Sequence, residues 1–342
     1  MQNDKKKMTT KKKLLIAAII VLSILLICSV GVLIFIDSVL GDLGQLDQQA
    51  TLSPEEMESL VGDATDETTP EYDKADQILP AKGVVNILLV GQDRREGEAK
   101  RTRTDAMILC TINTTTKTLT MTSFMRDVWV YIPGYYNNRL NVPYAKGGFD
   151  LLNETLSYNF GISADYNVEI DFNGFMDAID AIGGVEIELT SSEASYLNKR
   201  GNWDIEENNH WKLKKGKNLL TGSQALAYSR IRKIDSDFRR TERQRTVLTA
   251  LLEKAKTLDV TEIYALVKKI VPMLATDMSA NQILNLTLDM LPMLSDLNVV
   301  SQRIPMDGKY SYANKNGASV ITLSPADVEA VRKLLTETME VK

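Results

Sequence analysis

The hydrophobic positions of the chain first set apart one long uncharged run near its start. From Leu14 to Ile36 no charged residue occurs, and Leu, Ile, Val, Ala and Phe dominate. A helix of this length reaches roughly 34 Å at about 1.5 Å per residue, enough to cross a bilayer core. The run is longer than a usual signal-peptide core, and no small-residue cleavage site follows it. The pattern predicts an uncleaved transmembrane helix over 14–36.

Five apolar segments further along the chain predict β-strands. The first three are Val84–Val90, Ala106–Ile112 and Thr118–Phe124, and the later two are Val185–Leu189 and Leu297–Ile304. Their apolar residues are continuous or alternate with polar ones, which is typical of strands buried on both faces or on one. Because short polar connections join the first three, we expect these to form an antiparallel meander.

Helical periodicity dominates between and after these strands, and Gly183 and Gly184 break the chain before the fourth. Strands interleaved with helices predict an α/β (α+β) fold, with a central mixed sheet flanked by helices in a single domain over 83–342. The expected helices are Asp150–Phe160, Asn173–Ile182, a long helix from Asp237, and three more around 261–274, 279–294 and 325–338.

Charge divides the first part of the chain and predicts its orientation. Residues 1–13 carry six lysines and one aspartate, whereas residues 37–80 carry twelve acidic residues and one lysine. By the positive-inside rule the tail 1–13 lies in the cytoplasm and everything after the helix lies outside, which predicts a single-pass protein of the bacterial cell membrane. Residues 37–82 are acidic and polar, contain prolines and lack periodicity, so we expect an extracytoplasmic stalk with one short helix at Pro54–Leu60.

Composition then excludes several kinds of chemistry. The 342 residues are 44% hydrophobic and 25% charged, which is ordinary for a globular protein. Cys28 and Cys110 are too few and too poorly placed for a disulfide framework. His210 is the only histidine, so triads and histidine metal clusters are poorly supported. Neither a Walker-type loop nor a dinucleotide-binding fingerprint occurs.

The predicted meander has a consequence for chemistry. In an antiparallel meander the end of the first strand, the start of the second and the end of the third lie at one edge. Carboxylates and guanidinium groups gathered there suit a divalent cation together with a phosphate, because Mg²⁺ prefers one or two carboxylates completed by water and phosphate oxygens. The alternative is a set of exposed loop salt bridges. The residues expected at this edge are Asp93, Arg94, Arg103, Asp105, Arg126 and Asp127.

A second basic cluster follows between residues 228 and 245. Arg230 and Arg232 are expected on one face of an extended segment, since side chains alternate in a strand. Asp237 is expected to cap the next helix, whose first turns carry four arginines. Cations are mildly unfavourable at that end of the helix dipole, so Arg240 and Arg243 point to a bound anion. The alternative is a solvated charged face with pairs such as Glu242–Arg245.

Seven motifs of the chain resemble those of the LytR-CpsA-Psr family and occur in its order over residues 84–256. One departure is the Phe124-Met125 pair, where the family usually has Ile-Pro before Arg-Asp. We expect this to alter the local backbone more than the chemistry. The motifs are Asn86-Ile-Leu-Leu-Val-Gly-Gln-Asp93, Arg103-Thr-Asp105, Ser123-Phe-Met-Arg-Asp127, Tyr144-Ala-Lys-Gly-Gly148, Asp180-Ala-Ile-Gly-Gly-Val185, Leu220-Thr-Gly-Ser-Gln-Ala-Leu-Ala-Tyr-Ser-Arg-Ile-Arg232 and Asp237-Phe-Arg-Arg-Thr-Glu-Arg-Gln244.

The resemblance implies a membrane-anchored phosphotransferase that moves a glycopolymer from undecaprenyl pyrophosphate to peptidoglycan. The polymer would be a teichoic acid or a capsular or secondary wall polysaccharide. Asp93 and Asp105 match the aspartates that hold Mg²⁺, with Mn²⁺ as the alternative ion. The lipid tail is expected in a hydrophobic pocket. The arginines expected around the phosphates are Arg103, Arg126, Arg230, Arg232, Arg240 and Arg243, with Arg94 and Gln244 as substrate-binding residues.

Phosphoryl transfer mainly needs positioning and charge neutralisation, which a metal ion and arginines supply without histidine. Asp127 or Asp237 could take the proton of the acceptor hydroxyl or orient the arginines, and the sequence does not decide between these roles. Two other readings use the same site: hydrolysis of the lipid pyrophosphate, and binding of a polyprenyl phosphate or glycan without catalysis. A transcriptional regulator is disfavoured, because only about thirteen residues are cytoplasmic, and no nucleic-acid partner is expected.

Overall fold

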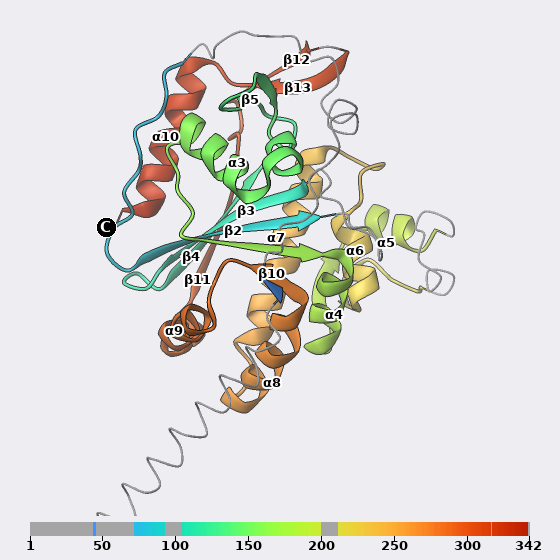
Figure 1. The fold of residues 1–342 in the computed structure, drawn as a ribbon. Helices are drawn as coiled ribbons and strands as arrows, with labels where there is room; N and C mark the ends of the chain where they lie inside the picture. The colour runs from blue at the N-terminus through green and yellow to red at the C-terminus, as the bar shows by residue number, and fades with distance from the viewer. Residues whose placement is uncertain (1–43, 46–71, 93–103, 200–210, 316, 341–342) are drawn as a thin grey trace, which may run out of the picture.

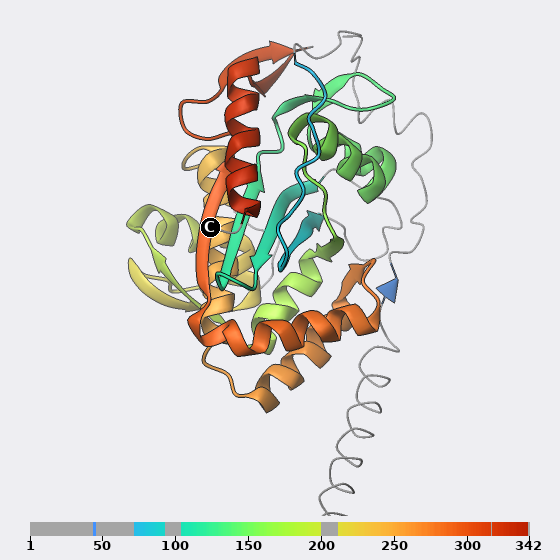
Figure 2. The ribbon, with the colours of Figure 1, turned by 90° about the vertical axis from the view of Figure 1, so that its left-hand side faces the viewer.

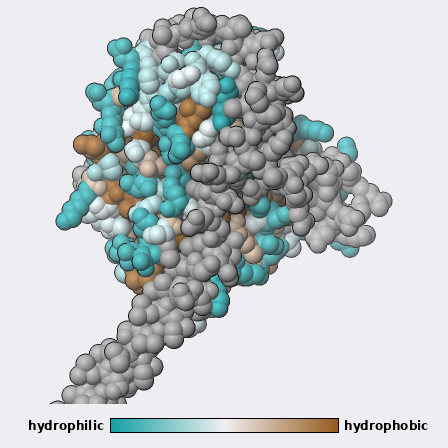
Figure 3. Space-filling model, viewed as in Figure 1, coloured by the Kyte–Doolittle hydropathy of each residue, from teal (hydrophilic) through white to brown (hydrophobic). Residues whose placement is uncertain are grey.

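A computed structural model describes residues 44–45, 72–92, 104–199, 211–315 and 317–340. The predicted transmembrane helix, the cytoplasmic tail, most of the stalk and the short helix predicted at Pro54–Leu60 lie outside these residues. None of the described helices is both long and apolar enough to cross a membrane. In the view of Figure 3 the described surface is mainly hydrophilic, with hydrophobic residues in small separate patches.

A seven-stranded mixed sheet forms the centre of the described fold. The strand order is β1-β10-β7-β2-β3-β4-β11, and β2, β3 and β4 form the predicted antiparallel meander. Strand β7 pairs with β2 in parallel, and β11 pairs with β4 in parallel, so the sheet is mixed as expected. The strands are β1 Gly44–Gln45, β2 Val84–Gln92, β3 Thr104–Asn113, β4 Thr118–Phe124, β7 Tyr166–Asp171, β10 Leu274–Thr276 and β11 Asn298–Ile304.

Helices cover both faces of this sheet (Figures 1 and 2). On one face, α3 and α10 pack on residues such as Leu88, Met107 and Phe124. The other face packs against α7, α9 and the short helix η3. Each central strand therefore buries side chains in both directions, which explains its continuous apolar sequence. The helices are α3 Val142–Phe160, α7 Asp237–Ala255, α8 Val260–Ile270, α9 Ala280–Met290 and α10 Pro325–Met339, with the 3₁₀ helices η2 Val271–Met273 and η3 Leu291–Asp296.

A side lobe, made of the described residues 172–199 and 211–231, packs beside the sheet against α7. Its buried residues form a hydrophobic cluster of their own, which includes Val185, Leu220 and Val247 of α7. The capping boxes of Thr190 and Thr221 begin two of its helices. Its elements are α4 Phe172–Ala181, β8 Val185–Leu189, α5 Ser191–Leu197, β9 Gly216–Leu220 and α6 Gly222–Ser229, with β8 and β9 paired in an antiparallel hairpin.

Two further hairpins lie outside the central sheet, β5 with β6 and β12 with β13, each antiparallel. Neither was predicted, because both consist of short strands that carry many polar residues. The structure also adds β7, β9, β10 and α5 to the predicted elements. The hairpin strands are β5 Trp129–Tyr131, β6 Asn137–Arg139, β12 Ser311–Lys315 and β13 Ala318–Thr322.

Two local predictions about the second basic cluster are wrong. Tyr228 and Ser229, expected to be extended, form the end of the helix α6, and Arg230 is its C-cap. The helix begins at Thr221, whose side chain accepts from the backbone N–H of Gln224. Ser236, not Asp237, is the N-cap of α7. Asp237 is the first helical residue, and its carboxylate pairs with Arg240 one turn later.

Residues 72–82, which the sequence analysis assigned to the stalk, lie on the folded body. The backbone N–H groups of Ala75, Ile78 and Ala81 donate to carbonyl groups of the body at 2.7–3.1 Å. The Tyr72 hydroxyl donates to Asn159 at 2.7 Å. Gly161, with a φ of 75°, ends α3 where this segment passes, and a Cβ there would overlap the Asp76 carbonyl. Residues 72–82 therefore pack on the folded body, and β1, which also falls in the predicted stalk, pairs with β10 in the central sheet.

Candidate functional site

Asp105 is the centre of a cluster of charges at the edge predicted from the meander. Its Oδ1 accepts from Arg126 Nη1 at 2.8 Å and from Arg232 Nη2 at 3.0 Å. Nη1 of Arg240 lies 3.8 Å from the same oxygen. Burial alone would raise the pKa of Asp105, but the three neighbouring guanidinium groups outweigh it and hold that pKa below its usual range. Asp105 is therefore an anion that gathers three cations.

Two further carboxylates hold Arg126 from the other side. Nε of Arg126 lies 3.5 Å from Asp127 and 3.8 Å from Asp237. Burial lowers the pKa of Arg126, but the three carboxylates around it raise that pKa by more. Asp127 also lies 3.8 Å from Arg139, a residue that the sequence analysis did not single out. Asp127 and Asp237 therefore share one guanidinium group, and both remain candidates for the proton acceptor.

Arg240 is the most deeply buried member of the cluster, with 1% of its surface exposed. Its Nη2 donates to Asp237 at 2.9 Å, while Nε and Nη1 have no hydrogen-bond partner among the described residues. Burial lowers the pKa of Arg240 to about 10, and the nearby arginines act in the same direction. It is still charged at neutral pH. A buried cation with unused donors is costly, and a phosphate would satisfy it.

A pocket of about 360 Å³ opens beside this cluster. Its inner wall is mainly apolar, whereas Asp105 and several basic residues line it as well. An apolar cavity with a few convergent charged groups is typical of a ligand site. The apolar wall consists of Leu89, Val90, Ala106, Ile108, Ile170, Phe172, Phe175, Tyr196, Leu226 and Leu248.

Four of the residues expected to contact the phosphates or the substrate line this pocket. They are Arg230, Arg232, Arg240 and Gln244. Arg230 follows the end of α6, with its guanidinium 4.4 Å from the centre of the Phe172 ring. Arg240 and Gln244 are four residues apart on α7 and so lie on one helix face. The arginines of two motifs therefore meet at one pocket, although the predicted extended segment is a helix end.

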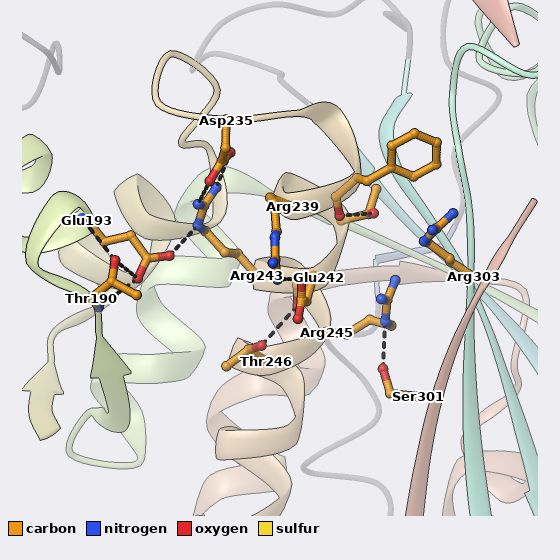
Figure 4. A network of polar contacts seen from close by, with 12 residues as sticks. Thr190, Glu193, Asp235, Arg239, Glu242, Arg243, Arg245, Thr246, Ser301 and Arg303 are labelled. Carbon is orange, nitrogen blue, oxygen red and sulfur yellow. Dashed lines mark hydrogen bonds and ion pairs between the residues drawn. The ribbon is translucent and has the colours of Figure 1, made fainter. Parts of the chain in front are cut away.

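Arg243 lies apart from the pocket and is saturated with partners (Figure 4). Its Nε donates to Glu193 at 2.7 Å, its Nη1 to the Ile231 carbonyl at 3.2 Å, and its Nη2 to Asp235. Only 4% of its surface is exposed. The expectation that Arg243 surrounds a phosphate has no support from this geometry. The capping box of α5 holds Glu193 in place, and its carboxylate binds Arg243 on the side of α7 that faces the side lobe.

The ion pair Glu242–Arg245, expected if the arginines of α7 formed a solvated charged face, is not formed. Glu242 pairs with Arg239 at 2.7 Å, and Arg245 donates to Ser301 at 2.6 Å (Figure 4). Arg245 is buried, so the arginines of α7 are not a uniform solvated face.

Of the two predicted metal ligands, Asp105 lies within the described residues and Asp93 does not. Asp93, Arg94 and Arg103 lie outside the described residues. Within the part of the chain that is described, no group of three or more His, Cys, Asp and Glu side chains is placed to hold a metal ion. Asp105 fits the expected donor set, because its contacts with the described arginines all use Oδ1. A carboxylate with such contacts on one oxygen can bind Mg²⁺ through the other.

Sequence reasoning missed the residues that shape the pocket. Lys233, Asp171 and Phe172 line it, and no motif or charge pattern marked them. Asp171 caps α4 by accepting from Gly174 at 2.8 Å, a local signal that was available in the sequence. The position of Asp171 and Phe172 beside the cluster follows from the parallel pairing of β7 with β2, which no local pattern reveals.

The chain is thus an α/β protein with a mixed sheet between helices and an apolar pocket beside an arginine–aspartate cluster. The LytR_cpsA_psr family model matches residues 53–337. The chain belongs to this family.

Relatives with informative names support the comparison. The chain is 32% identical over 259 residues to the polyisoprenyl-teichoic acid–peptidoglycan teichoic acid transferase TagT of Bacillus subtilis, covering 75% of this chain and 77% of the relative. The structure of TagT bound to LIIa-WTA has a TM-score of 0.63 and 27% identity, over 79% of this chain and 98% of that one. The family protein YwtF (TagT) with bound octaprenyl pyrophosphate lipid has a TM-score of 0.58 and 26% identity, over 81% and 99%.

Proposed function

We propose that this protein is a phosphotransferase that moves a phospho-glycopolymer from a polyprenyl-pyrophosphate carrier onto peptidoglycan. The observation that carries the proposal is the apolar pocket that shares its lining with the Asp105–arginine cluster. An isoprenoid chain fits the apolar wall, and a pyrophosphate fits the arginines. Relatives that bind octaprenyl pyrophosphate, or are named as teichoic acid transferases, support the same substrate class.

The described residues divide the work of such a transfer. Arg126, Arg232 and Arg240 neutralise the phosphates, and Asp105 fixes their guanidinium groups in place before the substrate arrives. Preorganised charge of this kind lowers the barrier because nothing has to reorganise during the reaction. Asp105 and Asp93 would hold Mg²⁺, or Mn²⁺ in its place. Such an ion supplies positive charge to the phosphate oxygens.

The transfer exchanges one phosphorus–oxygen bond for another. The acceptor hydroxyl, in this proposal the 6-hydroxyl of a muramic acid residue, attacks the phosphorus next to the polymer. The bond from that phosphorus to the bridging oxygen breaks, and the lipid leaves as polyprenyl phosphate. Asp127 or Asp237 takes the hydroxyl proton, since both lie by Arg126 at the same edge. With the predicted helix 14–36 as anchor, the reaction takes place at the extracytoplasmic surface of the cell membrane.

Transfer by the full chain in detergent micelles tests the proposal. The reaction contains a polyprenyl-pyrophosphate-linked glycopolymer, peptidoglycan fragments and Mg²⁺, and mass spectrometry detects the polymer–peptidoglycan linkage. We expect transfer to be lost on chelation, restored by Mg²⁺ and abolished in Asp105→Ala. Lys217→Ala, which removes an exposed ion pair with Glu186 on the side lobe, is the control and retains activity.

Two outcomes would replace the proposal. Release of polyprenyl phosphate with no acceptor product, at the same rate with or without peptidoglycan, would identify a lipid pyrophosphatase. Tight binding of the lipid pyrophosphate with no turnover under any metal condition would identify a binding module.

A further inference from the structure

A second pocket lies on a different side of α7 from the first. It measures about 690 Å³ and is bounded by the start of α7, by β11, by residues 306–310 and by α10. Phe238, Glu242 and Arg245 line it from α7, whereas Arg240, Gln244 and Leu248 face the first pocket. At about 100° per residue the two sets are centred roughly 130° apart, so they lie on different faces of one helix. α7 is therefore the wall between two cavities.

Arg245 points to a ligand in this second pocket. Its exposed fraction is 7%, and it lines the cavity. Nε donates to Ser301 at 2.6 Å, while Nη1 has no hydrogen-bond partner among the described residues. Burial lowers the pKa of Arg245, with Glu242 opposing this effect. A buried guanidinium with an unused donor favours an anion at that position.

An aromatic platform borders the same pocket. The Phe238 and Tyr310 rings lie 5.0 Å apart, and the Tyr310 and Tyr312 rings 5.6 Å apart. The Arg303 guanidinium lies 4.2 Å from the centre of the Phe238 ring, and its ion pair with Asp307 and its hydrogen bond to the Pro305 carbonyl hold it there. Tyr312, with an exposed fraction of 63%, stands edge to face against Tyr310 and carries the platform's aromatic residues to the surface.

The charges around the pocket exclude an apolar occupant. Three arginines, Arg239, Arg245 and Arg303, line it (Figure 4). Two carboxylates, those of Glu242 and Asp307, line it as well. Rigid aromatic faces suit the flat apolar faces of sugar rings, and the arginines suit a carboxylate or phosphate carried by the sugar.

The second pocket also adjoins the Asp105 cluster. Ser236 and Phe238 line the pocket, and Asp237 between them holds Arg240 and lies 3.8 Å from Arg126. Burial raises the pKa of Tyr312 on the platform, and the negative charge of Asp237 adds to that rise. A chain bound across the platform would thus lead to the proposed phosphoryl-transfer site from a different side of α7 than the lipid.

We propose that this second pocket binds an anionic glycan segment, with Arg245 holding the anionic group and Tyr310 and Tyr312 stacking on the sugar rings. The inference rests on the proposed function for its biological meaning, since both the acceptor and the transferred polymer are anionic glycans. Its binding chemistry stands on the pocket alone. The experiment therefore measures binding without turnover.

Isothermal titration of the full chain in detergent micelles, without lipid pyrophosphate, tests the site with three probes. These are disaccharide–peptide fragments of muramidase-digested peptidoglycan, a glycerol phosphate oligomer that carries sugar substituents, and a neutral chitin oligomer. We expect Arg245→Met to weaken binding of at least one anionic probe about tenfold, the effect of losing one charge-assisted hydrogen bond, and to spare the neutral one. Tyr312→Ala, at an exposed position, weakens charged and neutral glycans alike.

The two anionic probes distinguish the sources of the glycan. A selective loss for the peptidoglycan fragment assigns the pocket to the acceptor, and a selective loss for the glycerol phosphate oligomer assigns it to the transferred polymer. Lys217→Ala binds all probes as the wild type does. Arg245→Lys, which keeps the charge in place, separates loss of binding from misfolding because it retains part of the affinity.

The inference is overturned if the wild type binds neither anionic probe, or if Arg245→Met and Tyr312→Ala both bind as the wild type does. Tighter binding of a single-stranded oligonucleotide than of either glycan would also overturn it, because arginines and aromatic rings serve that ligand too. These outcomes leave the transfer assay unaffected, so failure of this site and failure of the proposed phosphotransfer are told apart.

Discussion

At the scale of single residues, Arg240 is the buried cation whose hydrogen-bond donors best fit a bound phosphate. It is almost fully enclosed and has two nitrogen atoms with no hydrogen-bond partner among the described residues. We predict that Arg240→Ala lowers kcat about 10²–10³-fold while the affinity for the lipid pyrophosphate falls much less, because the charge it stabilises is greatest in the transition state. Steady-state transfer assays and direct lipid binding measure the two effects.

Arg240→Lys is the companion variant, and it should recover only part of the rate. A lysine keeps the charge but cannot reproduce the fork that a guanidinium offers to a phosphate. Weaker lipid binding in Arg240→Ala with an unchanged kcat at saturation would instead mean that the arginine serves ground-state binding alone.

Arg243 is an arginine of the same helix with a different role. We predict that Arg243→Ala lowers the free energy of unfolding by about 3–5 kcal/mol, because it leaves Glu193 and Asp235 without their buried partner. Arg239→Ala, which breaks an exposed pair with Glu242, should cost about 0–1 kcal/mol. Chemical denaturation of the two variants makes the comparison. Similar stabilities would contradict the structural role of Arg243.

The lowered pKa of Asp105 predicts a pH dependence of stability. Ionised Asp105 is favoured by its arginines in the folded protein, so the unfolded chain binds the proton more readily. Its contribution is therefore fully present above the usual aspartate pKa of about 4 and is lost as the pH falls through the lower folded value. We predict that the stability of the wild type relative to Asp105→Asn is constant near neutral pH and shrinks below about pH 4. A difference that grows on acidification would contradict this.

At the scale of elements, α6 determines where two of the pocket arginines lie. The helix begins at the capping box of Thr221 with Gln224 and ends beside Arg230. We predict that Thr221→Ala destabilises the protein by about 0.5–2 kcal/mol and also weakens binding of the lipid pyrophosphate, because the end of α6 shifts or frays. Thermal unfolding and lipid titration measure the two effects.

Ser324→Ala is the matched control, since Ser324 forms the same kind of capping box at α10. It should cost a similar amount of stability without changing lipid affinity. If both variants weaken binding equally, the effect comes from global stability and not from the placement of Arg230.

α7 contributes side chains to three different environments, the two pockets and the side lobe. Arg240 and Gln244 face the apolar pocket, Phe238 and Arg245 face the second pocket, and Arg243 locks the side lobe. Its helical period of 3.6 residues separates these roles. Neighbouring arginines in the sequence therefore do different things.

At the scale of the whole molecule, residues 72–82 are an integral part of the folded body. We predict that a chain truncated to begin at Gly83 is less stable than one beginning at Tyr72 by about 2–4 kcal/mol, because it loses several hydrogen bonds to α3 and α10. Thermal unfolding of the two truncated chains measures the difference. Equal melting temperatures would mean that this segment lies on the body without stabilising it.

Much of the fold could be predicted from the sequence, because the hydrophobic patterns that indicate strands and helices involve only a few consecutive residues. The strand over Thr118–Phe124 and the strand Val185–Leu189 have the predicted bounds, and the long helix begins at Asp237 as expected. Apolar periodicity decides such elements. The meander of β2, β3 and β4 followed from short connections and correctly brought Asp105 next to Arg126.

The sequence by itself thus determined the meander strands β2, β3 and β4, the strands β8 and β11, most of the longer helices, and the meeting of Asp105 with arginines at one edge of the sheet. Only the tertiary structure decided which arginines face the apolar pocket, that Arg243 and Arg245 face elsewhere, and that residues 72–82 join the body. The reason is physical: side-chain periodicity is a property of a few consecutive residues. The partner of a charged group is set by distant segments, as Glu193 is for Arg243 and Ser301 for Arg245.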